Sequence, residues 1–283
     1  MFAPSTPMAR RQARTLGGSP LLRWALIAVA LVFLGVFLFV PLVAVFTFAF
    51  QKGSAGYLAA VSHPEARSAI LLTLTAAGIA VPLNLVFGLA AAWLLSRFRF
   101  PGRALLLTLI DLPFSVSPVI AGLIFVLLFG RQGWLGPWLA EWDLHVIFAV
   151  PGIVLATVFI TLPFVVREVL PVMQAQGSDE EEAALTLGAG GWRTFLRVTL
   201  PKVKWGVLYG VILCNARAMG EFGAVSVVSG HVRGVTTTLP LHAEILYNEY
   251  DFTGAFAVAS LLTLLALVTL VLKKYVEWRS EAS

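Results

Sequence analysis

Long runs of apolar residues, separated by short polar segments, extend over nearly the whole chain. Six of these runs are long enough to cross a lipid hydrocarbon core, which takes about 20 residues. They cover residues 24–50, 68–96, 104–130, 146–166, 205–229 and 252–272. Because helices satisfy their own backbone hydrogen bonds in lipid, this pattern predicts an all-α membrane protein. We expect six transmembrane helices in one domain, residues 21–283.

Residues 1–20 contain prolines and glycines but no long apolar run, and they are expected to form a flexible cytoplasmic tail. The apolar run that follows is too long for the hydrophobic region of a signal peptide, and it lacks a small-residue cleavage site. The first span is therefore expected to be retained in the mature protein.

The most polar segment between two apolar runs is SDEEEAALTLGAGGWRTFLRVTLP, residues 178–201. Ser178 is a good helix N-cap, and Glu181 is spaced to close a capping box with it. Gly188 is expected to end this short helix in a left-handed conformation. A second short helix is predicted to follow, and Pro201 is expected at the first position of the next helix.

Composition and charge extend this picture. The chain is 59% hydrophobic and 12% charged, whereas soluble domains are about 45–50% apolar and about 25% charged. Most lysines and arginines fall in segments that would share one side of the membrane. These residues are Arg10, Arg11, Arg14, Arg23, Arg97, Arg99, Arg103, Arg193, Arg197, Lys202, Lys204, Lys273, Lys274 and Arg279. The positive-inside rule then predicts cytoplasmic N- and C-termini and a cytoplasmic 178–201 segment.

Sequence signals for enzymatic chemistry are lacking. There is no glycine-rich phosphate loop with its lysine, so an ATPase site within this chain is not expected. The four histidines are scattered and there is one cysteine, which gives no metal-ligand spacing. We therefore expect a chain that is not an enzyme, with no catalytic residues, no metal and no cofactor of its own.

Arg217 and Glu221 are the clearest charged pair inside a predicted span, four residues apart on one helix face. Charges at this depth are costly and usually face a bundle interior or a cavity. One interpretation is an ion pair that neutralises both groups and allows close packing. The other is that this face lines a translocation path in which Arg217 helps to balance an anion, and both can hold at once.

The third predicted span carries Ser115 and Ser117 between Pro113 and Pro118. Prolines free carbonyl groups one turn earlier, so a kinked helix with hydroxyl donors along an anion path is one interpretation. The alternative is a packing helix whose serines bond back to the backbone. Asp111, in the same span, is expected to pair with a basic residue rather than to touch substrate.

The polar segment also resembles a known family. Glu182-Ala183-Ala184, then Gly188, then Val198, Leu200 and Pro201 match the "EAA loop" of permease subunits of bacterial ABC importers. The resemblance implies the type I importer permease fold. It also implies that residues 178–201 are the coupling element that docks on a cytoplasmic ATPase. Carried over by position, the ATPase-coupling residues are Glu182, Ala183, Ala184, Gly188 and Pro201.

Three further runs, in the third span and over residues 217–234 and 236–252, are similar to the oxyanion-importer branch, most of all to W-type permeases of sulfate and thiosulfate importers. The resemblance implies a multi-pass protein of the bacterial inner membrane that works by alternating access. Its implied partners are a second, T-type permease in a heterodimer, two ATPase subunits that hold the ATP, and a periplasmic sulfate-binding protein. Membrane lipid surrounds such a chain, and nucleic acid is not an expected partner.

Two alternatives stay open at this point. A permease of the molybdate or tungstate type would pair with a copy of itself. A non-ABC membrane protein would be either a secondary transporter or a pure assembly subunit. A secondary transporter would need an intramembrane carboxylate relay, and Asp111 and Glu221 are poorly placed for one.

Overall fold

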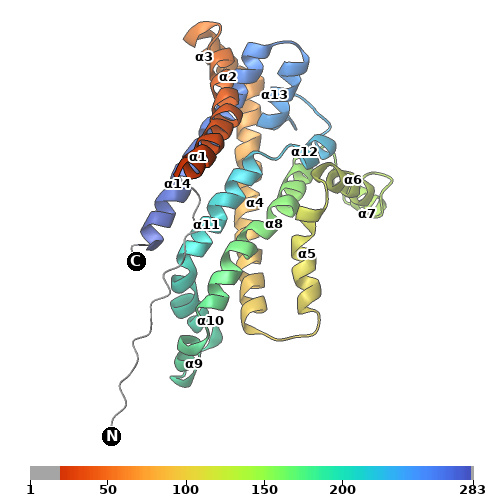
Figure 1. The fold of residues 1–283 in the computed structure, drawn as a ribbon. Helices are drawn as coiled ribbons and strands as arrows, with labels where there is room; N and C mark the ends of the chain where they lie inside the picture. Colours follow the sequence, from red (N-terminus) through yellow and green to blue (C-terminus); the bar gives the residue numbers. More distant parts are fainter. Residues whose placement is uncertain (1–19, 282–283) are drawn as a thin grey trace. The chain divides into compact units, whose positions relative to one another are not determined.

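The computed structural model describes the backbone of residues 20–281, and every regular element in that range is helical (Figure 1). The predicted tail therefore lies outside the described residues, apart from Pro20. The chain divides into two compact units, Met1–Ala44 and Val45–Ser283. The described part of the first unit consists of α1 (Pro20–Leu34), a turn of π-helix, η1 (Gly35–Phe39), and the beginning of α2 (Val40–Ala49).

The second unit holds the remaining helices. They are α3 (Gly53–Ser62), α4 (Pro64–Arg97), α5 (Arg103–Ser115), α6 (Pro118–Phe129), α7 (Gly136–Glu141), α8 (Val150–Ala175), α9 (Asp179–Thr186), α10 (Gly191–Thr194), the π-helical turn η2 (Phe195–Thr199), α11 (Leu200–Met219), α12 (Gly223–Val228), α13 (Leu239–Asn248) and α14 (Phe252–Glu281). Among the described residues, four continuous helices are long and apolar enough to cross a membrane: Leu21–Ala49, Pro64–Arg97, Val150–Ala175 and Phe252–Arg279. These four overlap the first, second, fourth and sixth predicted spans, and the helix of the fourth span continues beyond the predicted end at residue 166 to Ala175.

The third predicted span is broken rather than kinked. Helices α5 and α6 meet at an angle of 110°, which makes them either one bent crossing or a re-entrant loop. The break comes at Val116 and Ser117, which are extended, with ψ near 133°. Proline disfavours the helical conformation of the residue before it, so Pro118 ends α5 and starts α6. Pro113 lies inside α5 without breaking it.

The fifth predicted span is also divided. Helix α11 ends at Met219, and α12 begins at Gly223. The expectation of one helix over residues 205–229 is therefore wrong at Gly220–Phe222. The lysines and arginine of α11 lower its hydropathy, which explains why it does not qualify as a crossing helix by composition alone.

The centre of the second unit is formed by α4, α8 and α11, which pack side by side (Figure 1). Small residues allow this close approach. A Cβ atom added at Gly88 of α4 would lie 2.7 Å from Cβ of Val165 in α8, and one at Gly210 of α11 would lie 3.1 Å from Cα of Val165. Val165 is thus enclosed by glycine-containing surfaces of both neighbouring helices.

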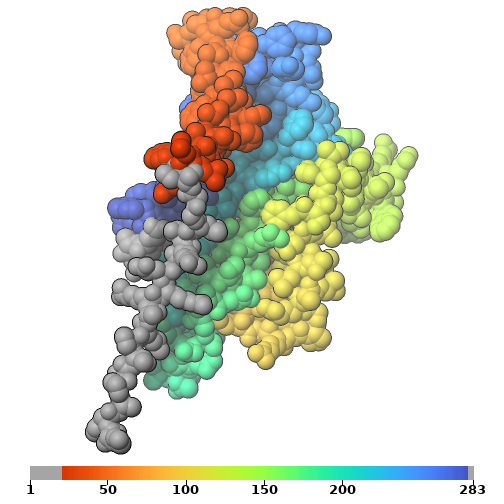
Figure 2. Space-filling view, viewed as in Figure 1, coloured from red at the N-terminus to blue at the C-terminus, as the bar shows by residue number. Residues whose placement is uncertain are grey.

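The two broken segments meet each other beside this centre. Helix α6 packs on α12, where a Cβ atom at Gly122 would lie 2.8 Å from the Ala224 carbonyl oxygen. Pro118 packs against Gly223, where an added Cβ atom would lie 2.7 Å from Cβ of Pro118. Helix α5 lies next to α8, and both are visible on one face of the unit, α5 in yellow and α8 in green (Figure 2).

Candidate functional site

The predicted coupling segment forms the short helix α9, which starts after Ser178 and ends as expected at Gly188. Gly188 has φ of +85°, its N–H donates to the Leu185 carbonyl, and the Ala189 N–H donates to the Ala184 carbonyl, both at 3.0 Å. This pair of bonds is a Schellman motif, in which a left-handed glycine closes the helix. The predicted helix and its glycine end are therefore confirmed.

The predicted capping box is wrong. Glu181 does not reach back to Ser178, and the Ser178 hydroxyl donates instead to Glu182 Oε1 at 2.6 Å. The Glu181 carboxylate forms two hydrogen bonds with Arg97 at the end of α4, Nε–Oε2 at 2.6 Å and Nη2–Oε1 at 2.8 Å. A charge-assisted, two-bond contact with a guanidinium is stronger than a local bond to one backbone N–H, so the distant partner prevails.

Glu181 connects three parts of the chain. Besides Arg97 it accepts a hydrogen bond of 2.7 Å from the hydroxyl of Thr199, which directly precedes α11. Arg97 also donates to the Met173 carbonyl in α8 at 3.1 Å. The Arg97 and Glu181 side chains are only 13% and 12% exposed. Helix α9 is thus attached to the ends of the same three helices that pack at the centre of the unit.

The outer side of the coupling segment is apolar as well as polar. Leu185, Leu187 and Trp192 are 52%, 88% and 69% exposed. Of the residues predicted to contact an ATPase, Glu182, Ala183, Gly188 and Pro201 are exposed and Ala184 is half-buried. Three large apolar side chains held outward on a polar segment form a surface suited to docking another protein.

Arg217 and Glu221 form the predicted ion pair, with Arg217 Nη1 2.6 Å from Glu221 Oε2. Glu221 lies in the break between α11 and α12 rather than in a helix, and its Oε1 accepts the Ala224 N–H at 2.9 Å. The Glu221 side chain is 1% exposed and that of Arg217 is 32% exposed. The carboxylate therefore neutralises Arg217 and satisfies an N–H at the start of α12, while the guanidinium is partly open.

Ser115 and Ser117 flank the break between α5 and α6, and both are exposed. Within the described part of the chain neither hydroxyl bonds back to the backbone, as a packing role would have required. The contact of Pro118 with Gly223 brings this break next to the one that contains Glu221. Three of the four residues expected along a path therefore lie at two breaks that adjoin, and Arg217 lies beside them in the last turn of α11.

Asp111 pairs with a basic residue, as expected, and that residue is Arg167 of α8. Arg167 Nε donates to Asp111 Oδ1 at 2.8 Å, and the side chains are 55% and 40% exposed. The guanidinium also lies over the ring of Phe114, 4.6 Å from its centroid. The sequence interpretation gave Arg167 no role, although an arginine inside an apolar run was a sufficient signal.

A buried polar group also lies at the centre of the unit. Asn84 of α4 donates to Thr161 Oγ1 at 2.7 Å and to the Val158 carbonyl at 3.1 Å, both in α8. Its Nδ2 atom is 3.9 Å from Cys214 Sγ in α11. Hydrogen bonds of this kind between helices satisfy polar groups that would have no partner in lipid.

A charged cluster joins the segment before α13 to the start of α4. Arg233 contacts Glu249 and, at 3.6 Å, Glu65. His242 of α13 is buried, and burial lowers its pKa below the ordinary value of 6.5, against the opposing effect of nearby Glu65. His242 is therefore favoured in its neutral form.

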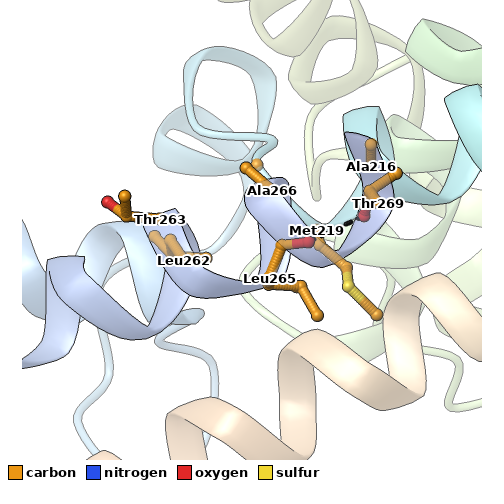
Figure 3. A pocket seen from close by; sticks show the side chains of 8 residues that line it. Ala216, Met219, Leu262, Thr263, Leu265, Ala266 and Thr269 are labelled. Carbon is orange, nitrogen blue, oxygen red and sulfur yellow. Dashed lines mark hydrogen bonds between the residues drawn. The ribbon is translucent and has the colours of Figure 1, made fainter. Parts of the chain in front are cut away.

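A cavity of about 290 Å³ lies between α11 and α14, and it is lined mainly by small and apolar side chains, among them Ala216, Met219 and Leu265 (Figure 3). The Thr269 hydroxyl is turned back to the Leu265 carbonyl at 2.8 Å. This lining contains no charged group, so the cavity is not suited to an anion.

Comparison with known proteins gives a family match over residues 84–281, to the "Binding-protein-dependent transport system inner membrane component" model. The chain is 52% identical over 280 residues to "Sulfate transport system permease protein CysW" of Escherichia coli (strain K12), covering 99% of this chain and 95% of that protein. It is 39% identical over 241 residues to "Sulfate transport system permease protein CysT" of the same organism, covering 85% and 87%.

A solved structure is similar in fold. It is described as "Crystal structure of a bacterial ABC transporter involved in the import of the acidic polysaccharide alginate", and it matches with a TM-score of 0.75 at 17% identity. The match covers 93% of this chain and 96% of that chain. The helices described above thus have the arrangement of an ABC transporter permease.

Proposed function

The chain belongs to the ABC importer permeases, the family of binding-protein-dependent transport system inner membrane components, and on this premise we propose that it is one permease subunit of an ATP-driven sulfate and thiosulfate importer. It is a multi-pass component of the inner membrane. The higher identity to the W-type than to the T-type sulfate permease of one organism supports a W-type role. The same comparison supports a heterodimer with a T-type subunit.

The attachment of α9 is the structural observation that carries the proposal. A force applied to the exposed Leu185, Leu187 and Trp192 reaches Glu181, and from there Arg97 of α4 and Thr199 before α11. Closure of two ATPase subunits around ATP would thereby move the central helices. We infer alternating access, in which this movement opens the permease pair to a periplasmic sulfate-binding protein.

Six crossings and cytoplasmic termini complete the proposed topology. The bent pair α5–α6 and the divided α11–α12 supply the third and fifth crossings, and the basic residues around α9 agree with a cytoplasmic position. In this arrangement the 230–251 segment faces the binding protein. ATP is held by the partner subunits, since this chain has no phosphate loop.

The decisive experiment is uptake of radiolabelled sulfate into proteoliposomes that contain this chain, the T-type permease, the ATPase subunits and the binding protein. We expect uptake that stops when ATP is withheld. Uptake that continues without ATP would contradict the proposal and support a secondary transporter, although the family match does not favour that class.

The alternative of a molybdate or tungstate permease is tested by purification and competition. Two permease species should co-purify, and unlabelled sulfate and thiosulfate should compete with the label more strongly than molybdate or tungstate. One permease species with preferred molybdate uptake would replace the proposed cargo.

A further inference from the structure

Helix α5 carries a polar stripe beside an apolar one. Thr108, Asp111 and Ser115 are spaced at i, i+3 and i+7, which places them on one helix face. Thr108 and Ser115 are exposed, and the side chain of Asp111 is 40% exposed. The neighbouring face presents Leu105, Leu109 and Leu112, which are 62%, 52% and 38% exposed. The two faces therefore suit different surroundings, one polar and the other apolar.

The polar stripe faces Arg167 at its middle. Asp111 accepts only the Nε–H of this residue, and within the described part of the chain the two terminal nitrogens of the guanidinium make no hydrogen bond. Phe114 supports the guanidinium plane at 4.6 Å, and Phe114 itself packs against Phe164 at 5.3 Å between ring centroids. The guanidinium is thus fixed on one edge and open on the other.

This pair lies well inside the apolar part of its helices. Asp111 comes eight residues after the start of α5 at Arg103, and Arg167 comes eight residues before the end of α8 at Ala175. At a rise of about 1.5 Å per residue, both lie about 12 Å from their helix ends. Half-exposed charges at that depth are unfavourable against lipid, and they usually face water or a cavity.

The Arg217–Glu221 pair differs from the Arg167–Asp111 pair in the surroundings of its carboxylate. The Glu221 carboxylate is fully enclosed and also accepts the Ala224 N–H, so this pair has a structural task. Asp111 has no second partner among the described residues, and both members of its pair are open. Of the two arginines, Arg167 has the more accessible donors.

Resting on the proposed function, we propose that Arg167 contacts the oxyanion in transit and that the polar stripe of α5 lines its path. The open edge of a guanidinium donates two parallel hydrogen bonds, which fit two oxygens of a tetrahedral dianion. Asp111 neutralises Arg167 through Nε between passages and leaves the open edge free, and its negative charge repels the bound anion. That repulsion keeps the contact weak enough for release, as conduction requires.

Cysteine accessibility tests the path directly. The single cysteine, Cys214, is buried, so a Cys214→Ala background allows Thr108→Cys and Ser115→Cys to be labelled alone by a membrane-impermeant thiol reagent. The assembled importer is treated from each side of the membrane, with and without inorganic sulfate. Leu109→Cys, on the apolar stripe, is the matched control.

We expect labelling at Thr108→Cys and Ser115→Cys that inorganic sulfate slows, with Leu109→Cys unlabelled. Absence of labelling at both polar positions would mean that the face is closed to water, and the proposal would fail. Labelling that sulfate leaves unchanged would also overturn it, since the face would then admit water without binding the anion.

Uptake by charge variants tests Arg167 itself. Arg167→Gln and the exchange Asp111→Arg with Arg167→Asp should both lower sulfate uptake at least tenfold, with Arg131→Gln as a matched arginine control. Arg167→Lys keeps the positive charge but loses the guanidinium edge that donates two parallel hydrogen bonds. This variant should raise the KM for sulfate more than it lowers kcat. Co-purification with the partner subunits verifies assembly of each variant.

Full uptake by the exchange variant would show that only pairing matters and would overturn the role of Arg167. The wild-type importer in the same preparation separates the two proposals. If the wild type does not take up sulfate, the proposed function fails. If the wild type is active and the variants match it, only the role of Arg167 fails.

Discussion

Replacing Glu181 by alanine should detach α9 from the central helices. The change removes two hydrogen bonds donated by Arg97 and one donated by Thr199, and it leaves the largely buried Arg97 without a counter-charge. Breaking a buried ion pair by removing one partner costs about 3–5 kcal/mol. The pair retains slight exposure, so we take the lower figure, about 3 kcal/mol, for the lost attachment.

Hydrogen exchange of the α9 amides measures this loss. Because about 1.4 kcal/mol corresponds to a tenfold change in an equilibrium constant, about 3 kcal/mol predicts roughly 100-fold faster exchange. ATP-dependent sulfate uptake should fall in parallel, while membrane insertion is retained.

Glu180→Ala is the matched control on the same helical turn. Glu180 pairs with Lys202 at 2.7 Å, but its side chain is 64% exposed. Exposed pairs contribute about 0–1 kcal/mol, so exchange should rise by less than about fivefold. Equal exchange rates in Glu181→Ala and the wild type would refute the reasoning that Glu181 fixes α9.

Three further predictions concern other positions. Gly188→Val should abolish uptake but not membrane insertion, because a φ of +85° costs an L-residue about 1–2 kcal/mol even though the space around Gly188 is open. Gly188→Asn should retain most of the uptake. Wild-type uptake by the valine variant would contradict this prediction. His242 has a lowered pKa, so the unfolded state binds a proton more readily, and the thermal midpoint of the purified importer should fall as the pH drops below 6.5; a His242→Gln variant should lose part of this dependence, and an identical pH profile would count against it. Gly122→Leu should lower the thermal midpoint by an overpacking cost of about 1–3 kcal/mol, since its Cβ atom would meet the α12 backbone at 2.8 Å, whereas Gly78→Leu, with open space, should not.

Local signals in the sequence were reliable where the cause is local. Helix α9 closes at Gly188 because a left-handed glycine acts within one turn of the helix end. The long apolar runs likewise predicted the four continuous crossing helices, since burial in lipid depends on length and composition. The i, i+4 spacing of Arg217 and Glu221 correctly predicted their ion pair.

Other features depended on partners far away in the chain. Glu181 has a suitable local bond within reach, but Arg97, 84 residues away, offers a stronger one. The division of the fifth span at Gly220–Phe222 accompanies the packing of α12 on α6. Neither contact has a signal in the local sequence.

The sequence by itself determined that this protein is helical, embedded in a membrane and equipped with a short polar helix between two spans. The tertiary structure decided how that helix is attached and which charged side chains stay open. The physical reason is that hydrophobic runs and helix ends act through neighbouring residues. The partners of Glu181 and Arg167 are chosen instead by which helices pack side by side.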